Sequence, residues 1–383
     1  MEVRLVPGGS SLPPATGLYT VTYEDFQSAK FLDEAWNDLL YKSTFPNIFL
    51  TWEWITTWWE WFGSEGNLQI ITAFEGEEVV GILPTYLSQI SIFPGIKIPA
   101  VRFIGDGGPV FPDYLGPIVK EGEEDRVIDW LAKFLFSISE QWQMILLSDV
   151  LTTSKVISTF VDILSQRFPI DTREGVRCPY QLLPDSYETF LAELNPRRRE
   201  SVRRNVRKAR KKYSLRFECY TSPDSVDRVF QIVLEIYKKS LRGKTNDQGF
   251  NRSDYLGFHR DVARKCAERG WLKLYILWFN DIPVAFIYGY FYAGVFWYYQ
   301  TGFDQAHTDD GPGSIILQLV IESVINEGGK EFDFLRGEED YKYHFTKNER
   351  RTRTVKAFRK SGMLHMAMRT QHNLSDLIHK FDK

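Results

Sequence analysis

The chain has 383 residues, more than one hydrophobic core usually serves, so we expect two domains. Its hydrophobic content of 43% and charged content of 25% are typical of a soluble globular protein. The formal net charge is only −3, but 12 basic and 27 acidic residues precede Asn195, whereas 35 basic and 23 acidic residues follow from there. This asymmetry indicates two halves with different partners.

Several kinds of protein are not expected from this sequence. No apolar run reaches the length of a membrane span, and the N-terminus lacks the charged and apolar regions of a signal peptide. The three cysteines are far apart and form no CxxC pair, and the six histidines show no paired spacing. We therefore expect a cytoplasmic protein without disulfides or a metal site.

The first half predicts alternating strands and helices after a loose, Pro/Gly/Ser-rich stretch at 1–16. A hairpin turns at 75–77, and the helix from 123 opens on acidic residues, as the helix dipole prefers. Residues 93–112 form a Gly/Pro-rich section. The predicted elements are strand 18–24, helices 25–41 and 52–59, strands 68–74, 79–87 and 114–119, helix 123–136, strand 144–148, helix 152–166 and two short strands ending near 183.

The second half predicts the same order for its first eight elements. Ser222 is the expected N-cap of a helix with Pro223 at its first position, and a hairpin turns at Asn280 and Asp281. Both halves therefore predict the order β-α-α-β-β-β-α-β over their first eight elements, a repeat of pattern rather than of residues. The predicted elements are strand 214–220, helices 222–240 and 253–268, strands 271–279, 283–292 and 295–303, helix 314–326, and strands 332–335 and 352–358.

A basic helix is predicted between the two halves, at 195–213. Its positive charges fall at nearly every second position, so they surround the helix instead of forming one stripe. Such a helix could bind nucleic acid, an anionic membrane surface or a synthase complex through 197–212, or be a solvated linker paired with the acidic first half. No aromatic residues are interleaved before Tyr213, so specific recognition of nucleic acid is not expected.

A glycine-rich turn, Gly311-Pro312-Gly313-Ser314, opens the apolar helix predicted from 314. Unpaired backbone amides and a partial positive charge at a helix start suit phosphate groups, and glycines allow close approach to the backbone. The alternative is an ordinary turn and cap. The corresponding helix of the first half is entered through acidic residues at 121–125, which would repel a diphosphate.

A charged turn follows the strand predicted at 332–335 and carries groups suited to acid and base chemistry. Glu338, Asp340 or His344 could take a proton from a nucleophile, and Tyr341 could protonate a leaving thiolate. A solvated turn with salt bridges is the alternative for this cluster. The strand and turn also contain Asp333, Arg336 and Lys342.

Tryptophans cluster in the helix predicted from 52. Rings at 54, 58, 61 and 62 share roughly one face, which indicates packing in a core. Trp52 and Glu53 fall off that face, so they are candidates for contact with an acceptor substrate, although a place in the core is the alternative for them too.

Together, these motifs and the order of elements resemble the GNAT acetyltransferases linked to cellulose and exopolysaccharide biosynthesis (the BioF2-like type), and they are also similar to the Fem-type aminoacyl transferases. The resemblance covers about 20–360 and implies an α/β protein with a mixed sheet, in which a basic helix joins two tandem GNAT-like folds. The segments that carry it are Thr51-Trp52-Glu53-Trp54, Trp58-Trp59, Phe62-Gly63, Gly81-Ile82-Leu83-Pro84, the Arg-rich connector, Gly302-Phe303-Asp304, Gly311-Pro312-Gly313, Phe332 to Glu338 and Tyr341-Lys342.

The resemblance implies a division of labour between the domains. The expected limits are 17–194 for a degenerate first domain on the acceptor side, 195–213 for the connector, 214–370 for the domain that binds acyl-CoA, and 371–383 for a tail. We assign Gly302, Gly311, Gly313, Ser314 and Arg336 to the donor site, Glu338, Tyr341, Lys342 and His344 to catalysis, and Trp52, Glu53 and Asp333 to the acceptor.

The expected reaction moves an acetyl or other acyl group from acyl-CoA, a co-substrate, to an amine or hydroxyl of a sugar or polysaccharide precursor, without a metal. The Gly311–Ser314 turn lacks the basic or Gln-led phosphate loop of simpler GNAT enzymes. One alternative is a Fem-like aminoacyl transferase whose donor is charged tRNA. The other is a non-catalytic binding subunit of an exopolysaccharide assembly.

Overall fold

The computed structural model describes residues 17–241 and 249–359. The loose stretch at 1–16 and the tail at 371–383 lie outside the described residues. Among the residues that are described, no helix is both long and apolar enough to cross a membrane.

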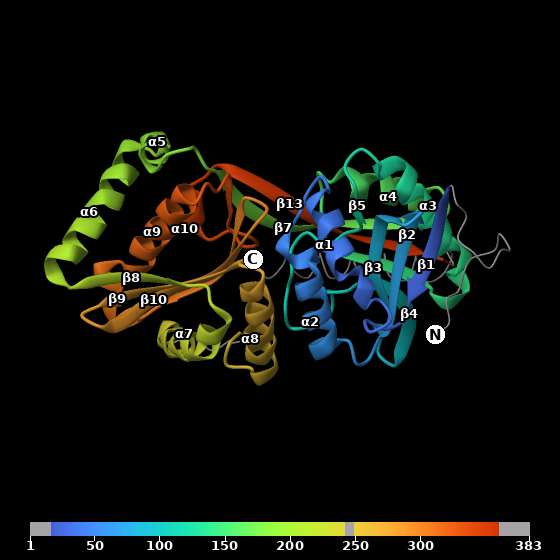
Figure 1. Ribbon diagram of the computed structural model, residues 1–383, viewed down its shortest axis with the longest axis horizontal. Helices are drawn as coiled ribbons and strands as arrows, with labels where there is room; N and C mark the ends of the chain where they lie inside the picture. The colour runs from blue at the N-terminus through green and yellow to red at the C-terminus, as the bar shows by residue number, and fades with distance from the viewer. Residues whose placement is uncertain (1–16, 242–248, 360–383) are drawn as a thin grey trace. The chain divides into compact units, whose positions relative to one another are not determined.

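The described chain divides into two compact α/β units (Figure 1). Unit 1 contains the residues up to Val176 together with those from Arg351 onward, and unit 2 contains Arg177–Arg350. Each unit has a mixed sheet, because one parallel pair of strands lies among antiparallel ones. The predicted fold class, α/β with a mixed sheet, is confirmed.

The sheet of unit 1 has the strand order β1-β2-β3-β4-β6-β13, with the short β5 beside β3. β1 to β4 are antiparallel, β4 and β6 run parallel, and β13 is antiparallel to β6. The strands are β1 Leu18–Tyr23, β2 Asn67–Glu75, β3 Glu78–Phe93, β4 Ile96–Phe103, β5 Ile118–Val119, β6 Met144–Leu151 and β13 Asn348–Phe358. The helices are α1 Asp33–Tyr41, α2 Trp52–Phe62, α3 Glu124–Ser137 and α4 Lys155–Ser165.

Helices cover both faces of this sheet, and alternation along β3 separates them. At Gly81 a side chain would collide with Val127 of α3, so the glycine lets α3 pack closely on the sheet. Tyr86 points to the other face, where its ring lies 5.6 Å from that of Trp58 on α2. The rings at 54 and 58 are buried, which confirms the core prediction for these two positions of α2, whereas the Trp61 ring is exposed.

The sheet of unit 2 has the strand order β7-β12-β11-β10-β9-β8. β8 to β11 are antiparallel, β11 and β12 run parallel, and β7 is antiparallel to β12. The strands are β7 Ile170–Leu182, β8 Leu215–Tyr220, β9 Leu272–Phe279, β10 Ile282–Tyr292, β11 Val295–Phe303 and β12 Glu331–Asp333. The helices are α5 Tyr187–Glu193, α6 Pro196–Lys212, α7 Val226–Ser240, α8 Ser253–Glu268, α9 Pro312–Asn326 and α10 Asp340–Tyr343.

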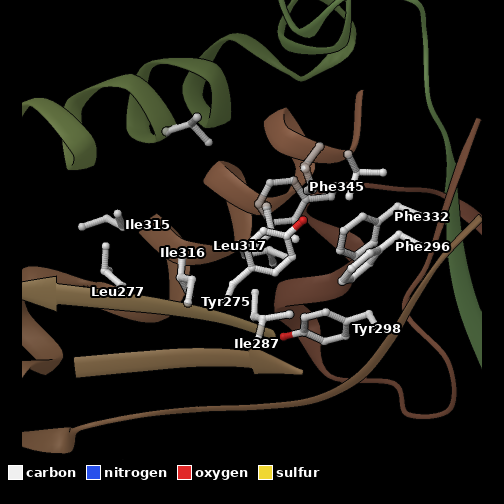
Figure 2. Close-up of a cluster of buried hydrophobic side chains, with 14 of the residues drawn as sticks. Tyr275, Leu277, Ile287, Phe296, Tyr298, Ile315, Ile316, Leu317, Phe332 and Phe345 are labelled. Atoms are coloured by element: carbon white, nitrogen blue, oxygen red, sulfur yellow. The ribbon is translucent and has the colours of Figure 1, made fainter. Parts of the chain in front are cut away.

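In unit 2, α9 and α6 lie on one side of the sheet, and α7 and α8 lie on the other (Figure 1). The apolar core fills the space between α9 and the sheet (Figure 2). Phe296 of β11 and Phe332 of β12 stack there with ring centroids 4.8 Å apart. Ile287 of β10 belongs to this core, whereas the next residue, Tyr288, faces Phe230 of α7.

Each sheet is completed by a strand from the other half of the sequence. β7 begins in unit 1 and pairs with β12 in unit 2, whereas β13 begins in unit 2 and pairs with β6 in unit 1. The bounds of the two compact units therefore differ from the predicted domain limits, 17–194 and 214–370, each of which is one continuous stretch of sequence. The predicted connector at 195–213 corresponds to α6, and α6 packs on α9 within unit 2.

Several predicted elements are confirmed almost to the residue, among them the helix at 253–268 and the strand at 295–303. The Gly/Pro-rich section 93–112, to which the sequence analysis assigns no element, contains β4. The helix predicted at 25–41 is shorter, since the Asp25 carboxylate accepts a hydrogen bond from the Ser28 amide in a turn and α1 begins only at Asp33.

Candidate functional site

The two parallel strands at the centre of unit 2 diverge after a short paired stretch. β11 and β12 pair from Val295 and Glu331 to Trp297 and Asp333. Beyond Trp297, the described part of the chain pairs β11 only with β10. From residue 298 onward, no described strand covers the other edge of β11.

The helix α9 begins just after β11 and has no side-chain cap. Gly311 is its N-cap residue, with φ 65° and ψ 43°, a left-handed conformation that favours glycine. Close packing explains the glycine at position 313, because a Cβ atom there would lie 3.0 Å from the Phe303 side chain of β11. The amides of Gly313 and Ser314 have no backbone partner among the described residues. They are available to an anion.

Arg198 of α6 brings a positive charge to this helix start. Its Nη2 atom lies 3.5 Å from the Ser314 hydroxyl, and its guanidinium lies over the Phe345 ring, 4.5 Å from the centroid. No carboxylate pairs with Arg198 in the ranges that the structure describes, and partial burial lowers its pKa. A guanidinium stays charged at neutral pH even so, and this one lacks a compensating anion.

The acidic residue next to the helix start is already neutralised. The Asp310 carboxylate accepts hydrogen bonds from Lys212 Nζ at 2.8 Å and from the Tyr213 hydroxyl at 2.7 Å. Both hydrogen bonds lower the pKa of Asp310, and the one from Lys212 has the larger effect. The start of α9 therefore keeps the positive charge of Arg198 and of the helix dipole.

In the corresponding helix of unit 1, α3, the first residue places its own carboxylate at the helix start. Glu124 is buried and accepts hydrogen bonds from the Thr44 hydroxyl at 2.9 Å and the Gly122 amide at 3.1 Å, and Lys155 lies 3.4 Å away. Burial alone would raise the pKa of Glu124, but these hydrogen bonds and that of its own amide outweigh it and lower the pKa. A second anion at this helix start would be repelled.

Lys342, predicted as catalytic, holds the turn after β12 in place. Its side chain is 3% exposed, and Nζ donates to the carbonyl groups of Leu335, Arg336 and Gly337 at 3.4, 2.6 and 3.3 Å. Glu339 completes the set with a salt bridge of 2.9 Å. Leu335 has a φ of 55°, so Lys342 stabilises a turn that is strained for leucine.

Tyr341 reaches the divergence of the two strands. Its hydroxyl donates to the hydroxyl of Tyr298, the first β11 residue beyond the paired stretch, at 3.4 Å. Burial raises the pKa of both groups, and that of Tyr298 rises to about 12. Both phenols therefore stay protonated across the physiological range.

The remaining residues of the predicted catalytic turn are more exposed. Glu338 is exposed, with its carboxylate 3.6 Å from Arg177 Nε, and His344 is exposed as well. Arg336 is partly buried. Gly302 lies on β11 with no room for a side chain, because a Cβ atom would meet Phe286 and lie 3.3 Å from the Ser240 hydroxyl.

Asp333, predicted to contact the acceptor, is fully buried in an ionic network. Its carboxylate accepts from the Leu335 amide at 2.8 Å and from Arg350 at 3.0 Å. Arg350 also pairs with Glu331 and lies 3.8 Å over the Tyr180 ring. Through these contacts, Asp333 helps to hold β12 against β7.

The other two predicted acceptor residues belong to unit 1. The Glu53 carboxylate is buried and accepts from the Asn37 side chain at 3.0 Å. Trp52 packs edge-on against the rings of Phe26 and Trp36. Their surroundings within unit 1 are those of a packed helix pair.

The structure brings most of the predicted unit 2 residues into two neighbouring groups. One is the start of α9, and the other is the turn after β12. Arg198 bridges them, because it contacts both Ser314 and Phe345. Sequence reasoning missed Arg198 by treating all charges of the helix alike. Its spacing from Val202 and Ala209, the buried residues of α6, was the signal that set it apart.

No group of three or more metal-ligating side chains gathers among the described residues.

The family model described as Acetyltransferase (GNAT) domain matches residues 196–343, which lie within unit 2. Unit 2 therefore carries a GNAT-type acetyltransferase domain, and the chain is an acyltransferase. A comparison with curated proteins finds no match.

Solved structures with a similar fold extend over nearly the whole chain. FemX aligns with a TM-score of 0.59 and 10% identity, covering 84% of this chain and 95% of FemX. A conserved protein of unknown function from Bacteroides thetaiotaomicron aligns with a TM-score of 0.53 and 14% identity, covering 88% of this chain and 99% of the other. The C-terminal domain of a putative lysylphosphatidylglycerol synthetase from Agrobacterium fabrum aligns with a TM-score of 0.52 and 8% identity, covering 91% of this chain and 96% of that domain.

Replacing Lys342 with Met tests whether this residue supports the turn. We expect a loss of stability of about 2 kcal/mol, because three carbonyl groups and Glu339 lose a charged donor. Lys330→Met is the matched control, since the exposed Lys330 side chain pairs with exposed Asp185 and with no other acid in the described ranges. Thermal unfolding measures both. An unchanged melting temperature with lost transferase activity would instead assign Lys342 to the chemistry.

Proposed function

We propose that this acyltransferase takes its acyl group from acetyl-CoA or another acyl-CoA and transfers it to an amine or hydroxyl of a sugar or polysaccharide precursor. The observation that carries the proposal is the start of α9, where the amides of Gly313 and Ser314 and the guanidinium of Arg198 lack an anionic partner in the described part of the chain. A diphosphate is an anion that such donors bind well.

The open edge of β11 supports the same donor. An extended chain with amide groups, such as pantetheine, can add to a free strand edge through main-chain hydrogen bonds. This edge begins at Tyr298, and β11 leads from there to Phe303, which packs against Gly313. The donor would thus run from the helix start toward the two tyrosines, with its thioester beside them.

In the proposed step, the acceptor nitrogen or oxygen attacks the thioester carbonyl, the C–S bond breaks, and the acyl group passes to the acceptor. Tyr341 keeps its proton, and its hydroxyl turns from Tyr298 to donate a hydrogen bond to the departing sulfur, which leaves as a thiolate. The acceptor proton goes to a base, for which Glu338, Asp340 and His344 remain the candidates. Lys342 and Asp333 act by holding the backbone around the site.

Substitution of Ser314 tests the donor site. Ser314→Glu places a carboxylate beside Arg198, as Glu124 does at the start of α3, and should weaken CoA binding by about 2 kcal/mol, roughly thirtyfold. Ser314→Gln has the same size without the charge and should retain most of the affinity. Thermal shift and calorimetry with CoA measure both. If the native protein shows no shift at millimolar CoA, the proposal fails.

Tyr341→Phe tests the assigned hydrogen-bond donor. We expect acceptor-dependent release of the CoA thiol to slow by about a hundredfold, because the leaving sulfur loses its hydrogen bond. CoA affinity and the melting temperature should stay unchanged, since the ring remains in its packing site. Tyr343→Phe is the control, because this neighbouring tyrosine directs its hydroxyl to Glu349 at 3.3 Å. Equal rates for the two variants would remove Tyr341 from the mechanism.

A second candidate donor is aminoacyl-tRNA, as the resemblance to Fem-type transferases implies. The observation that favours it is a face of α6 formed by Arg197, Arg204, Lys208 and Lys211. All four side chains are exposed, and none forms an ion pair within the described ranges. By contrast, Arg203 and Arg207 pair with Glu188 and Glu200. The same face would also suit an anionic membrane surface or an acidic synthase partner.

Charge reversal at Arg204, Lys208 and Lys211 separates the two donors. If tRNA is the donor, its affinity should fall steeply with salt, and the triple Glu variant should lower the slope of log K against log salt by about 0.7 for each phosphate that is no longer neutralised. Arg203→Gln with Arg207→Gln is the matched control. Weak tRNA binding that is unaffected by the variant, together with intact CoA binding, would leave acyl-CoA as the donor.

A further inference from the structure

Unit 1 contains a cavity of 340 Å³ whose wall is formed by β4, the loop that follows it and β6. It lies where these two parallel strands diverge, since their pairing ends at Arg102 and Leu146. The polar part of its wall comes from Arg102, Asp106, Ser148 and Asp149, and the apolar part includes Val110 and Leu115.

An ion pair fixes the polar wall. Arg102 Nε donates to Asp106 Oδ2 at 2.8 Å, and the Ser148 hydroxyl donates to the same oxygen at 3.0 Å. The Tyr86 hydroxyl donates a hydrogen bond to the main-chain carbonyl of Asp106 at 2.5 Å. The side chains of Arg102 and Asp106 are only 16% and 14% exposed, so this arrangement is largely shielded from water.

Several polar groups of this wall have no protein partner. In the described part of the chain, no hydrogen bond engages the Nη atoms of Arg102 or Oδ1 of Asp106. The same holds for the amides of Gly107 and Gly108. At Gly107 the φ of 96° favours glycine, and a Cβ atom would push the guanidinium of Arg102 out of its position. Free donors and a free acceptor therefore lie side by side in one cavity.

We propose that this cavity binds a neutral, hydroxyl-rich small molecule about the size of one sugar ring or polyol. A carboxylate ligand would be repelled by Asp106, and an ammonium ligand by Arg102, because the ion pair is balanced within the wall. A hydroxyl group donates and accepts at once, so neighbouring hydroxyls satisfy Asp106 Oδ1 and the Arg102 Nη atoms together. The volume is at the small end of ligand pockets.

This site is distinct from the donor site of unit 2. It lies within unit 1, and it uses neither Arg198 nor α9. The helix start of unit 1 is closed to anions by Glu124, yet the divergence of its strands keeps a polar cavity. Binding there is therefore expected with or without CoA.

Ligand-observed NMR and calorimetry with the full chain test the proposal. The probes are glucose, N-acetylglucosamine and myo-inositol, with acetate and ethylammonium as charged comparisons. At least one hydroxyl-rich probe should bind at millimolar concentration. Arg102→Lys keeps the charge and can pair with Asp106, but it lacks the Nη donors, so affinity should fall about tenfold.

Two further variants keep the test decisive. Arg126→Lys, at an exposed ion pair with Glu75 in the same unit, should leave binding unchanged. If Arg102→Lys unfolds, Ser148→Ala replaces it, because losing its hydroxyl frees Asp106 to turn and should weaken binding severalfold. The absence of binding by all three probes, preference for a charged probe, or equal binding by folded Arg102→Lys would each overturn the proposal.

Discussion

The early end of the parallel pairing between β11 and β12 is the constraint on which unit 2 depends. Two strands that diverge inside a sheet leave main-chain groups without ladder partners, and buried groups of that kind must be satisfied elsewhere. Side chains do this on the β12 side. Asp333 accepts from the Leu335 amide, and Lys342 donates to the next three carbonyl groups. On the β11 side the edge stays open, which is where we propose that the donor lies.

Unit 1 meets the same constraint with different residues. β4 and β6 also separate after three paired positions, and Asp149, with a φ of 51°, lies beyond the paired part of β6 as Leu335 lies beyond β12. Here, however, the helix start is filled by Glu124, and the polar wall belongs to the cavity around Arg102 and Asp106. Unit 2 therefore leaves its helix start open to a ligand, whereas unit 1 fills the helix start and leaves a cavity where its strands diverge.

Local features of this architecture were predictable, and its pairing was not. The turn at Asn280 and Asp281, both with positive φ, follows from residue preferences at tight hairpins. The acidic entry to α3 and the glycine entry to α9 were also visible, so the contrast between the two helix starts could be anticipated. The exchange of β7 and β13 could not, because alternation identifies a strand without naming its neighbour. For the same reason, sequence alone does not distinguish a buried lysine that supports the turn at 342 from a catalytic one.

The charge at the start of α9 favours a compact anion over an extended one. Arg198 lies on the buried face of α6 beside two free amides, which together with the helix dipole match one diphosphate. The exposed face with Arg204, Lys208 and Lys211 points away from Val202 and Ala209, the residues that pack α6 onto its unit. A donor with many phosphates would need both faces of the same helix. A single diphosphate needs only the inner one, and that face is where the described chain leaves a guanidinium without a counterion.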